Sequence, residues 1–178
     1  MKRRLAVLCL LTAPFAAHAQ SDNWQTVVAP DLSFRVEMPA PADKGKANEK
    51  EKGHATPRVA WQAKRDGQIF DFDFVDYDDG WFSKRDSKVM AKELGRGEAE
   101  KAFPKDKFKY VRDELVELQG WAGYALDIED GAGVLIMMRT YIVKDRLFRL
   151  LVTATIDPKT REAANRFLDS FKLAESRQ

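Results

Sequence analysis

The strongest β-strand pattern of hydrophobic residues lies in the second half of this chain. Residues 134–143 and 146–156 are almost wholly apolar, around Lys144-Asp145, and strands of this kind are covered on both faces. If residue 143 pairs with residue 146, one face carries Met137, Tyr141, Phe148, Leu150 and Val152. The other face then carries Ile136, Met138, Ile142, Leu147 and Leu151.

Alternation of apolar and polar residues predicts further strands. They are expected at 108–118, at 124–128, and at 58–64 and 68–77 with Asp66-Gly67 as the hairpin turn. A first hairpin is expected within 23–38, with Trp24, Thr26 and Val28 alternating before the turn and Phe34, Val36 and Met38 after it. The stretch at about 42–57 is charged and aperiodic, which predicts a mobile surface loop.

Helical spacing occurs twice. Residues 83–94 favour a helix that ends at Gly95, and 97–104 favour a short helical turn that ends at Pro104. A C-terminal helix should begin with Asp157 as N-cap and Pro158 in its first turn. Its buried stripe is Ala164, Phe167, Leu168 and Phe171. The pattern therefore predicts an α+β fold: an antiparallel sheet of six to eight strands flanked by helices, with the C-terminal helix packed on the sheet.

The first residues follow a different pattern. Lys2, Arg3 and Arg4 precede an apolar run that is shorter than the roughly 20 residues needed to cross a bilayer, and Ala17-His18-Ala19 follows. This is typical of a secretory signal peptide, 1–19, cleaved after Ala19. We expect a periplasmic or secreted single domain, 20–178, with no membrane span in the mature chain.

Cleavage changes the chemistry that remains. Cys9 and His18 are removed, so the mature chain has no cysteine and only one histidine, His54. Thiol nucleophiles, disulfides and thiolate metal sites are excluded. The 30 basic and 28 acidic residues become 27 and 28, so the basic character of the precursor does not indicate a nucleic-acid partner.

Three segments together resemble a known family. They are "WQTVVAPDLSFRVEMPAP", "VELQGWAGYALDIEDGAGVLIMMRTYIVKDRLFRLLV" and "NRFLDSFKL". They are similar to small secreted bacterial domains with the PsbP-like fold, whose relatives include DcrB-like envelope proteins and chaperones that shield hydrophobic segments. The resemblance covers nearly the whole mature chain. It implies a sheet flanked by helices and action by binding other proteins, and it supplies no catalytic residues.

The stretch "FDFDFVDYDDGW", 70–81, offers the densest candidate chemistry. In a strand, Phe70, Phe72 and Phe74 would face the core, and Asp71 and Asp73 would mark a solvated face near a sheet edge. The alternative is a Ca²⁺ or Mn²⁺ site formed by Asp76, Asp78 and Asp79 in the following turn. An EF-hand loop does not fit, because Val75 and Tyr77 would occupy ligand positions.

Tryptophans and arginines are the other candidates for binding. Trp81 and Trp121 could lie at a binding surface, where tryptophan is enriched, or anchor the sheet as Trp61 could. Arg139, Arg146 and Arg149 could bind an anion, but such arginines more often pair across strands with groups such as Asp127 or Glu129.

No motif for catalysis or cofactor binding is present. The chain has no G-x-S-x-G and no phosphate-binding glycine loop. His54, the histidine that a serine hydrolase could use as its base, falls in the charged stretch. We expect a non-catalytic envelope protein without metal or cofactor, whose partner is another envelope protein or its hydrophobic segment. The alternatives are a cation or small-ligand binder using residues 76–81, and a hydrolase of an envelope polymer that uses two carboxylates.

Overall fold

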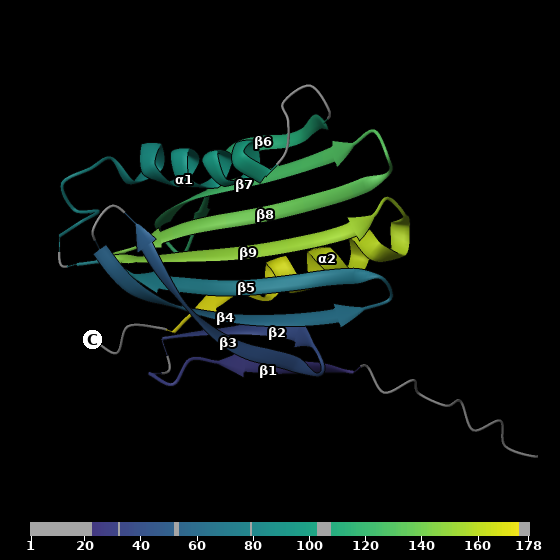
Figure 1. Ribbon diagram of the computed structural model, residues 1–178, viewed down its shortest axis with the longest axis horizontal. Coiled ribbons are helices and arrows are strands. Elements are labelled where there is room, and N and C mark those ends of the chain that lie inside the picture. The colour runs from purple at the N-terminus through teal and green to yellow at the C-terminus, as the bar shows by residue number, and fades with distance from the viewer. Residues whose placement is uncertain (1–22, 32, 52–53, 79, 103–107, 175–178) are drawn as a thin grey trace, which may run out of the picture.

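A seven-stranded antiparallel sheet forms the centre of the molecule, in the order β3-β4-β5-β9-β8-β7-β6 (Figure 1). The computed structural model describes residues 23–31, 33–51, 54–78, 80–102 and 108–174. A smaller sheet has the order β1-β2-β10. The elements are β1 (Trp24–Val28), β2 (Phe34–Pro39), β3 (Ala42–Glu51), β4 (His54–Arg65), β5 (Gln68–Asp76), α1 (Ser87–Ala102), β6 (Phe108–Leu118), β7 (Trp121–Asp130), β8 (Val134–Val143), β9 (Arg146–Thr155), α2 (Pro158–Ser170) and β10 (Lys172–Leu173). The predicted α+β fold, with six to eight strands in its main sheet, is confirmed.

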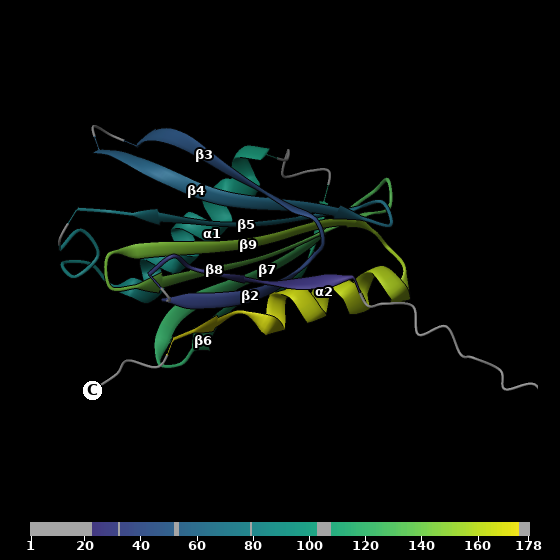
Figure 2. The same ribbon diagram turned by 90° about the horizontal axis from the view of Figure 1, so that it is seen from below.

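The two helices cover opposite faces of the large sheet (Figure 2). Helix α2 and the small sheet pack on one face, against β5 and β9. Helix α1 packs on the other face, over β6, β7 and β8. The face that carries α1 is therefore only partly covered by a helix, because β3, β4 and β5 lie beyond it.

The register of the β8–β9 hairpin is the predicted one, with Val143 opposite Arg146. Each strand consequently contributes alternate residues to two separate cores. The core under α2 holds Met137, Tyr141, Phe148, Leu150 and Val152. The core under α1 holds Ile136, Met138, Ile142 and Leu147, with Leu151 at its margin. Both predicted face assignments are confirmed.

The C-terminal helix also forms as predicted. The Asp157 carboxylate accepts hydrogen bonds from the backbone N–H groups of Lys159 and Thr160, which otherwise lack partners at a helix start. Phe167 is fully buried on the helix, and Phe171 follows directly after it in the same core. The Asp66-Gly67 turn also forms, with positive φ at both residues, as a two-residue hairpin of this type requires.

The prediction of a mobile loop at 42–57 is wrong. Residues 42–51 form β3, which pairs with β4 from Ala42 opposite Ala63 to Glu51 opposite His54. The predicted strand 58–64 therefore begins earlier, at His54. Apolar periodicity reports burial, whereas an edge strand can form through backbone pairing and carry charged residues that discourage further pairing. A charged, aperiodic sequence is compatible with that position.

The predicted helix boundaries are also wrong, because Gly95 does not end α1. The helix begins after Asp86, whose side chain caps Lys88 and Val89, and it continues to Ala102 through part of the turn expected at 97–104. Gly95 is buried against the sheet, where a Cβ atom would lie 2.8 Å from the Tyr124 ring. The glycine allows close helix packing and does not act as a stop.

In the first hairpin, Phe34, Val36 and Met38 are buried as predicted, but the inward residue of β1 is Val27 and Val28 is exposed. The predicted signal peptide, 1–19, lies outside the described residues, so the predicted cleavage and single mature domain remain predictions. Within the described ranges, neither helix is long and apolar enough to cross a membrane.

Candidate functional site

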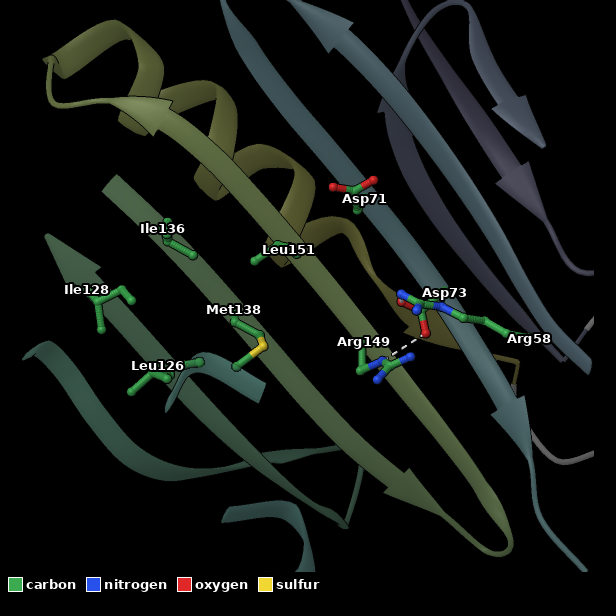
Figure 3. Close-up of a pocket in the computed structure, with 10 residues that line it drawn as sticks. Arg58, Asp71, Asp73, Leu126, Ile128, Ile136, Met138, Arg149 and Leu151 are labelled. Atoms are coloured by element: carbon green, nitrogen blue, oxygen red, sulfur yellow. Dashed lines mark hydrogen bonds and ion pairs between the residues drawn. The ribbon is translucent and has the colours of Figure 1, made fainter. Parts of the chain in front are cut away.

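A pocket of about 280 Å³ lies on the half-covered face of the large sheet, beside α1. Its residues come from six elements, and they change from apolar to charged across the sheet (Figure 3). The apolar part consists of Ala99 from α1, Leu126 and Ile128 from β7, Ile136 and Met138 from β8, and Leu151 from β9. The charged part consists of Arg58 from β4, Asp71 and Asp73 from β5, and Arg149 from β9.

The apolar part of the pocket exists because α1 ends its coverage there. Met138 and Ile136 extend from β8 toward the helix, and each is 7% exposed. Ala99 is the small residue that α1 places at this point, so the helix leaves space above the strands. The result is a concave apolar surface that can hold a side chain or an acyl-like group.

The charged part is organised around Asp73, which is only 4% exposed. The Arg58 Nη2 atom donates to Asp73 Oδ2 at 2.7 Å, and the Arg149 Nε atom donates to Asp73 Oδ1 at 2.9 Å. Asp73 and Arg149 lie directly opposite each other on β5 and β9. A buried carboxylate is tolerated where each oxygen has a charged donor, and this triad meets that condition.

Asp71 lies two residues earlier on the same strand face and has a different environment. Its Oδ1 atom accepts a hydrogen bond of 2.7 Å from Gln62 Nε2, a neutral amide. Burial raises the pKa of the Asp71 carboxyl above its usual value, and the negative charge of Asp73 raises it further. The Gln62 hydrogen bond and the charges of Arg58 and Lys64 act in the opposite direction without cancelling the increase.

This environment corrects the prediction for the strand. Phe70, Phe72 and Phe74 are buried in the core as expected. However, β5 is not near a sheet edge with a solvated carboxylate face, since β4 and β9 flank it and Asp73 is buried. An aspartate in an alternating pattern was interpreted as evidence of a solvent-exposed strand face. Here, however, an arginine on the neighbouring strand compensates the charge of the aspartate.

The acidic turn after β5 is held by the β8–β9 hairpin. The Asp145 carboxylate accepts hydrogen bonds from the backbone N–H groups of Gly80 at 3.0 Å and Phe82 at 3.2 Å, and these bonds lower its pKa. The Tyr77 N–H donates to the Asp145 carbonyl oxygen at 2.8 Å. These hydrogen bonds account for the aspartate in the Lys-Asp sequence of the hairpin turn, a sequence that is unusual in such turns.

Of the predicted cation ligands, Asp76 has a carboxylate with a described side-chain partner. Asp76 forms a bidentate ion pair with Arg146, through contacts of 2.5 and 3.0 Å. The Asp78 carbonyl oxygen accepts from the Trp81 N–H at 3.0 Å, and Asp79 lies outside the described residues. No group of three or more acidic, histidine or cysteine side chains suited to a metal occurs in the described part of the chain.

Neither Trp81 nor Trp121, the candidate binding tryptophans, is among the residues that line the pocket. Trp81 is half-buried, stacks on Tyr77 at 6.0 Å between ring centroids, and lies 4.1 Å from the Arg85 guanidinium. Trp121 is half-buried at the start of β7, opposite Leu118 of β6. The expectation that arginines pair across strands is met by Arg139, which contacts Asp127 at 2.6 Å.

The pocket itself was not predicted as a site. Arg149 was treated as one cross-strand arginine among three, and Met138 as core filling. A signal was present: Arg149 interrupts the apolar strand "LFRLLV", and Asp73 alternates with phenylalanines that are buried. The two residues lie close together because β5 pairs with β9. This pairing is non-local, so it cannot be inferred from either segment alone.

Comparison with known proteins supports the fold. No protein-family model matches the chain, and no curated protein matches it. Among solved structures, cyanobacterial PsbP (CyanoP) from Synechocystis sp. PCC 6803 is similar with a TM-score of 0.57 and 8% sequence identity, over 91% of this chain and 100% of that chain. LpqN of Mycobacterium tuberculosis, described as involved in cell envelope biogenesis, aligns with a TM-score of 0.46 and 13% identity, over 85% and 91% of the two chains. The fold is PsbP-like, and at these identities the likeness shows the fold alone.

Proposed function

We propose that this chain is a non-catalytic accessory protein of the bacterial envelope that binds an apolar segment of another envelope protein. The observation that carries this proposal is the pocket beside α1, which joins an apolar floor to a charged end. Its volume of about 280 Å³ lies below the range of about 300–1,000 Å³ typical of drug-sized ligand sites. That size suits one or two side chains of a partner better than a whole cofactor.

The location is part of the proposal. The basic start, apolar run and A-x-A sequence at 1–19 favour export, and the mature chain would then meet its partner outside the cytoplasm. The PsbP-like fold is compatible with such a role but does not specify it.

The test is photocrosslinking in intact cells with a photoreactive residue in place of Lys64. Lys64 is an exposed residue on β4, and its charge is close enough to Asp71 to act on the pKa of that carboxyl. A discrete adduct with an envelope protein is expected. The adduct should disappear when Ala99→Leu fills the pocket and persist when Val89→Leu is made on the exposed face of α1. Absence of any adduct, or an adduct insensitive to Ala99→Leu, would contradict the proposal.

A second candidate function is hydrolysis of an envelope polymer by the Asp71 and Asp73 carboxylates. The raised pKa of Asp71 favours it, because a general acid beside a second carboxylate needs a pKa shifted in this direction. Two guanidiniums already bind Asp73, which weakens it as a base. Release of soluble fragments from purified cell wall, abolished by Asp71→Asn, would favour the hydrolase and count against the binding role.

A further inference from the structure

The charges at the polar end of the pocket are unevenly distributed. The guanidiniums of Arg58 and Arg149 both bind Asp73, one on each carboxylate oxygen. Asp71 lines the same pocket, and the hydrogen-bond partner recorded for it in the described part of the chain is the neutral Gln62 amide. Asp71 is therefore the carboxylate with the weaker charge compensation.

The neighbouring strands do not remove this imbalance. The charged groups near Asp71 are Asp73 on its own strand, Arg58 and Lys64 on β4, and Arg149 on β9. Burial outweighs the attraction of the basic groups and raises the pKa of Asp71, and Asp73 adds repulsion. A positive charge brought beside Asp71 by a ligand would restore part of the lost solvation, and it would do so only in the bound state.

We propose that the pocket takes a large apolar side chain of a partner polypeptide together with an adjacent basic group, which binds the Asp71 carboxylate. This inference rests on the proposed function and names the chemistry of the segment that is bound. The apolar side chain lies over Met138, Ile136 and Leu151, and the basic group reaches across β9 to β5. The strand order places these two parts side by side.

The experiment uses purified residues 20–178 and three capped peptides that differ at one position: acetyl-Ser-Phe-Lys-Ser-amide and its Gln and Glu counterparts. Dissociation constants are measured by NMR titration at pH 7. The Lys peptide should bind about three- to tenfold more tightly than the Gln peptide, as for a partly solvated ion pair. The Glu peptide should bind most weakly.

Two variants locate the effect. Asp71→Asn keeps an acceptor for Gln62 and removes the charge, so the preference for Lys over Gln should be lost. Asp66→Asn in the exposed β4–β5 turn changes the same residue type outside the pocket and should leave the preference intact.

The outcomes separate this inference from the proposed function. Equal binding of the Lys and Gln peptides, or tightest binding of the Glu peptide, would overturn the inference and leave the binding role standing. If free 2-phenylethylamine bound as tightly as the Lys peptide, the inference that the ligand is a polypeptide would be overturned. No binding of any peptide at millimolar concentration, with the photocrosslinked adduct also absent, would overturn both.

Discussion

Two aspartates on one face of the same strand show that residue type alone does not determine the chemistry of a side chain. Asp71 and Asp73 have the same side chain and the same orientation relative to β5. Asp73 lies between two guanidiniums, whereas Asp71 lies beside an amide. The difference comes from the residues that flank them on β4 and β9, and Arg149 of β9 is distant from Asp73 in sequence.

The raised pKa of Asp71 predicts that Asp71→Asn stabilises the fold at neutral pH. A carboxyl with a higher pKa in the folded state than in the unfolded state contributes full stability below its unfolded-state pKa, about 3.9. That contribution is lost as pH rises through the folded-state pKa. Removing the charge should therefore raise stability at pH 7 by up to about 1 kcal/mol, and should have little effect at pH 3.

Urea unfolding of the wild-type chain and Asp71→Asn at pH 7 and pH 3 checks this prediction. Asp66→Asn serves as the control, since Asp66 is exposed. If Asp71→Asn were less stable than the wild-type chain at pH 7, the ionised Asp71 carboxylate would stabilise the folded state, contrary to this prediction.

Asp145 supports a second prediction at the residue scale. Its carboxylate binds the Gly80 and Phe82 N–H groups, so Asp145→Ala should accelerate hydrogen exchange at both amides while exchange in β5 stays unchanged. The pKa of Asp145 is lowered, so this anchoring is complete above the usual aspartate range and is lost as pH falls through the lowered value. Amide exchange measured by NMR tests both, and unchanged exchange in Asp145→Ala would contradict the assignment.

At the scale of elements, prediction succeeded where burial produces a pattern. The two-faced strands β8 and β9, the stripe of α2 and the Asp157 cap were all evident in the sequence, because each results from local spacing. It failed for β3, which carries no apolar pattern, and at Gly95, whose role depends on Tyr124 and Thr140 of other elements. The pocket was missed for the same reason, since six elements build it.

Helix α1 contains two glycines that make a matched test. A Cβ atom at Gly95 would lie 2.8 Å from the Tyr124 ring and 3.2 Å from Thr140 Oγ1, whereas a Cβ at Gly97 would meet nothing within 4 Å. Gly95→Ala should therefore destabilise the protein by about 1–3 kcal/mol through overpacking. Gly97→Ala should stabilise it by about 0.5–1 kcal/mol through helix propensity.

Thermal unfolding followed by circular dichroism distinguishes the two glycines of α1. If both variants were stabilised, α1 would pack less closely on β7 and β8 than the Gly95 geometry indicates. If both variants were destabilised, the result would contradict the open space that the structure shows beside Gly97.

For the whole molecule, export is the prediction with the widest consequence. The precursor should be processed after Ala19, so the mature protein should begin at Gln20 and carry no cysteine. Intact-mass analysis of protein recovered from the periplasm or medium checks the cleavage site. Replacing Ala17 and Ala19 with bulky residues should leave the precursor uncleaved, and unaltered processing would contradict the assigned site.

The two helices bury residues of different size in their cores. Helix α2 is anchored by Phe167 and Leu168. Among the described side chains of α1, the buried residues are Ala91, Gly95 and Ala99, and Met90 and Leu94 are only half-buried against the same core. Because apolar burial contributes roughly 25 cal/mol per Å², the small residues of α1 give it less stabilisation from packing. Helix α1 should open more readily, so its amides should exchange at least about tenfold faster than those of α2 in native conditions.

Hydrogen exchange with mass spectrometry tests this difference and connects it to binding. Ala99 belongs both to α1 and to the pocket wall, so a peptide held in the pocket should slow exchange in α1 and leave α2 unchanged. Ala99→Leu should abolish the slowing by the peptide. Exchange in α1 as slow as in α2 without ligand would mean that the helix is held by contacts other than its small buried residues, and the pocket would then be a rigid site.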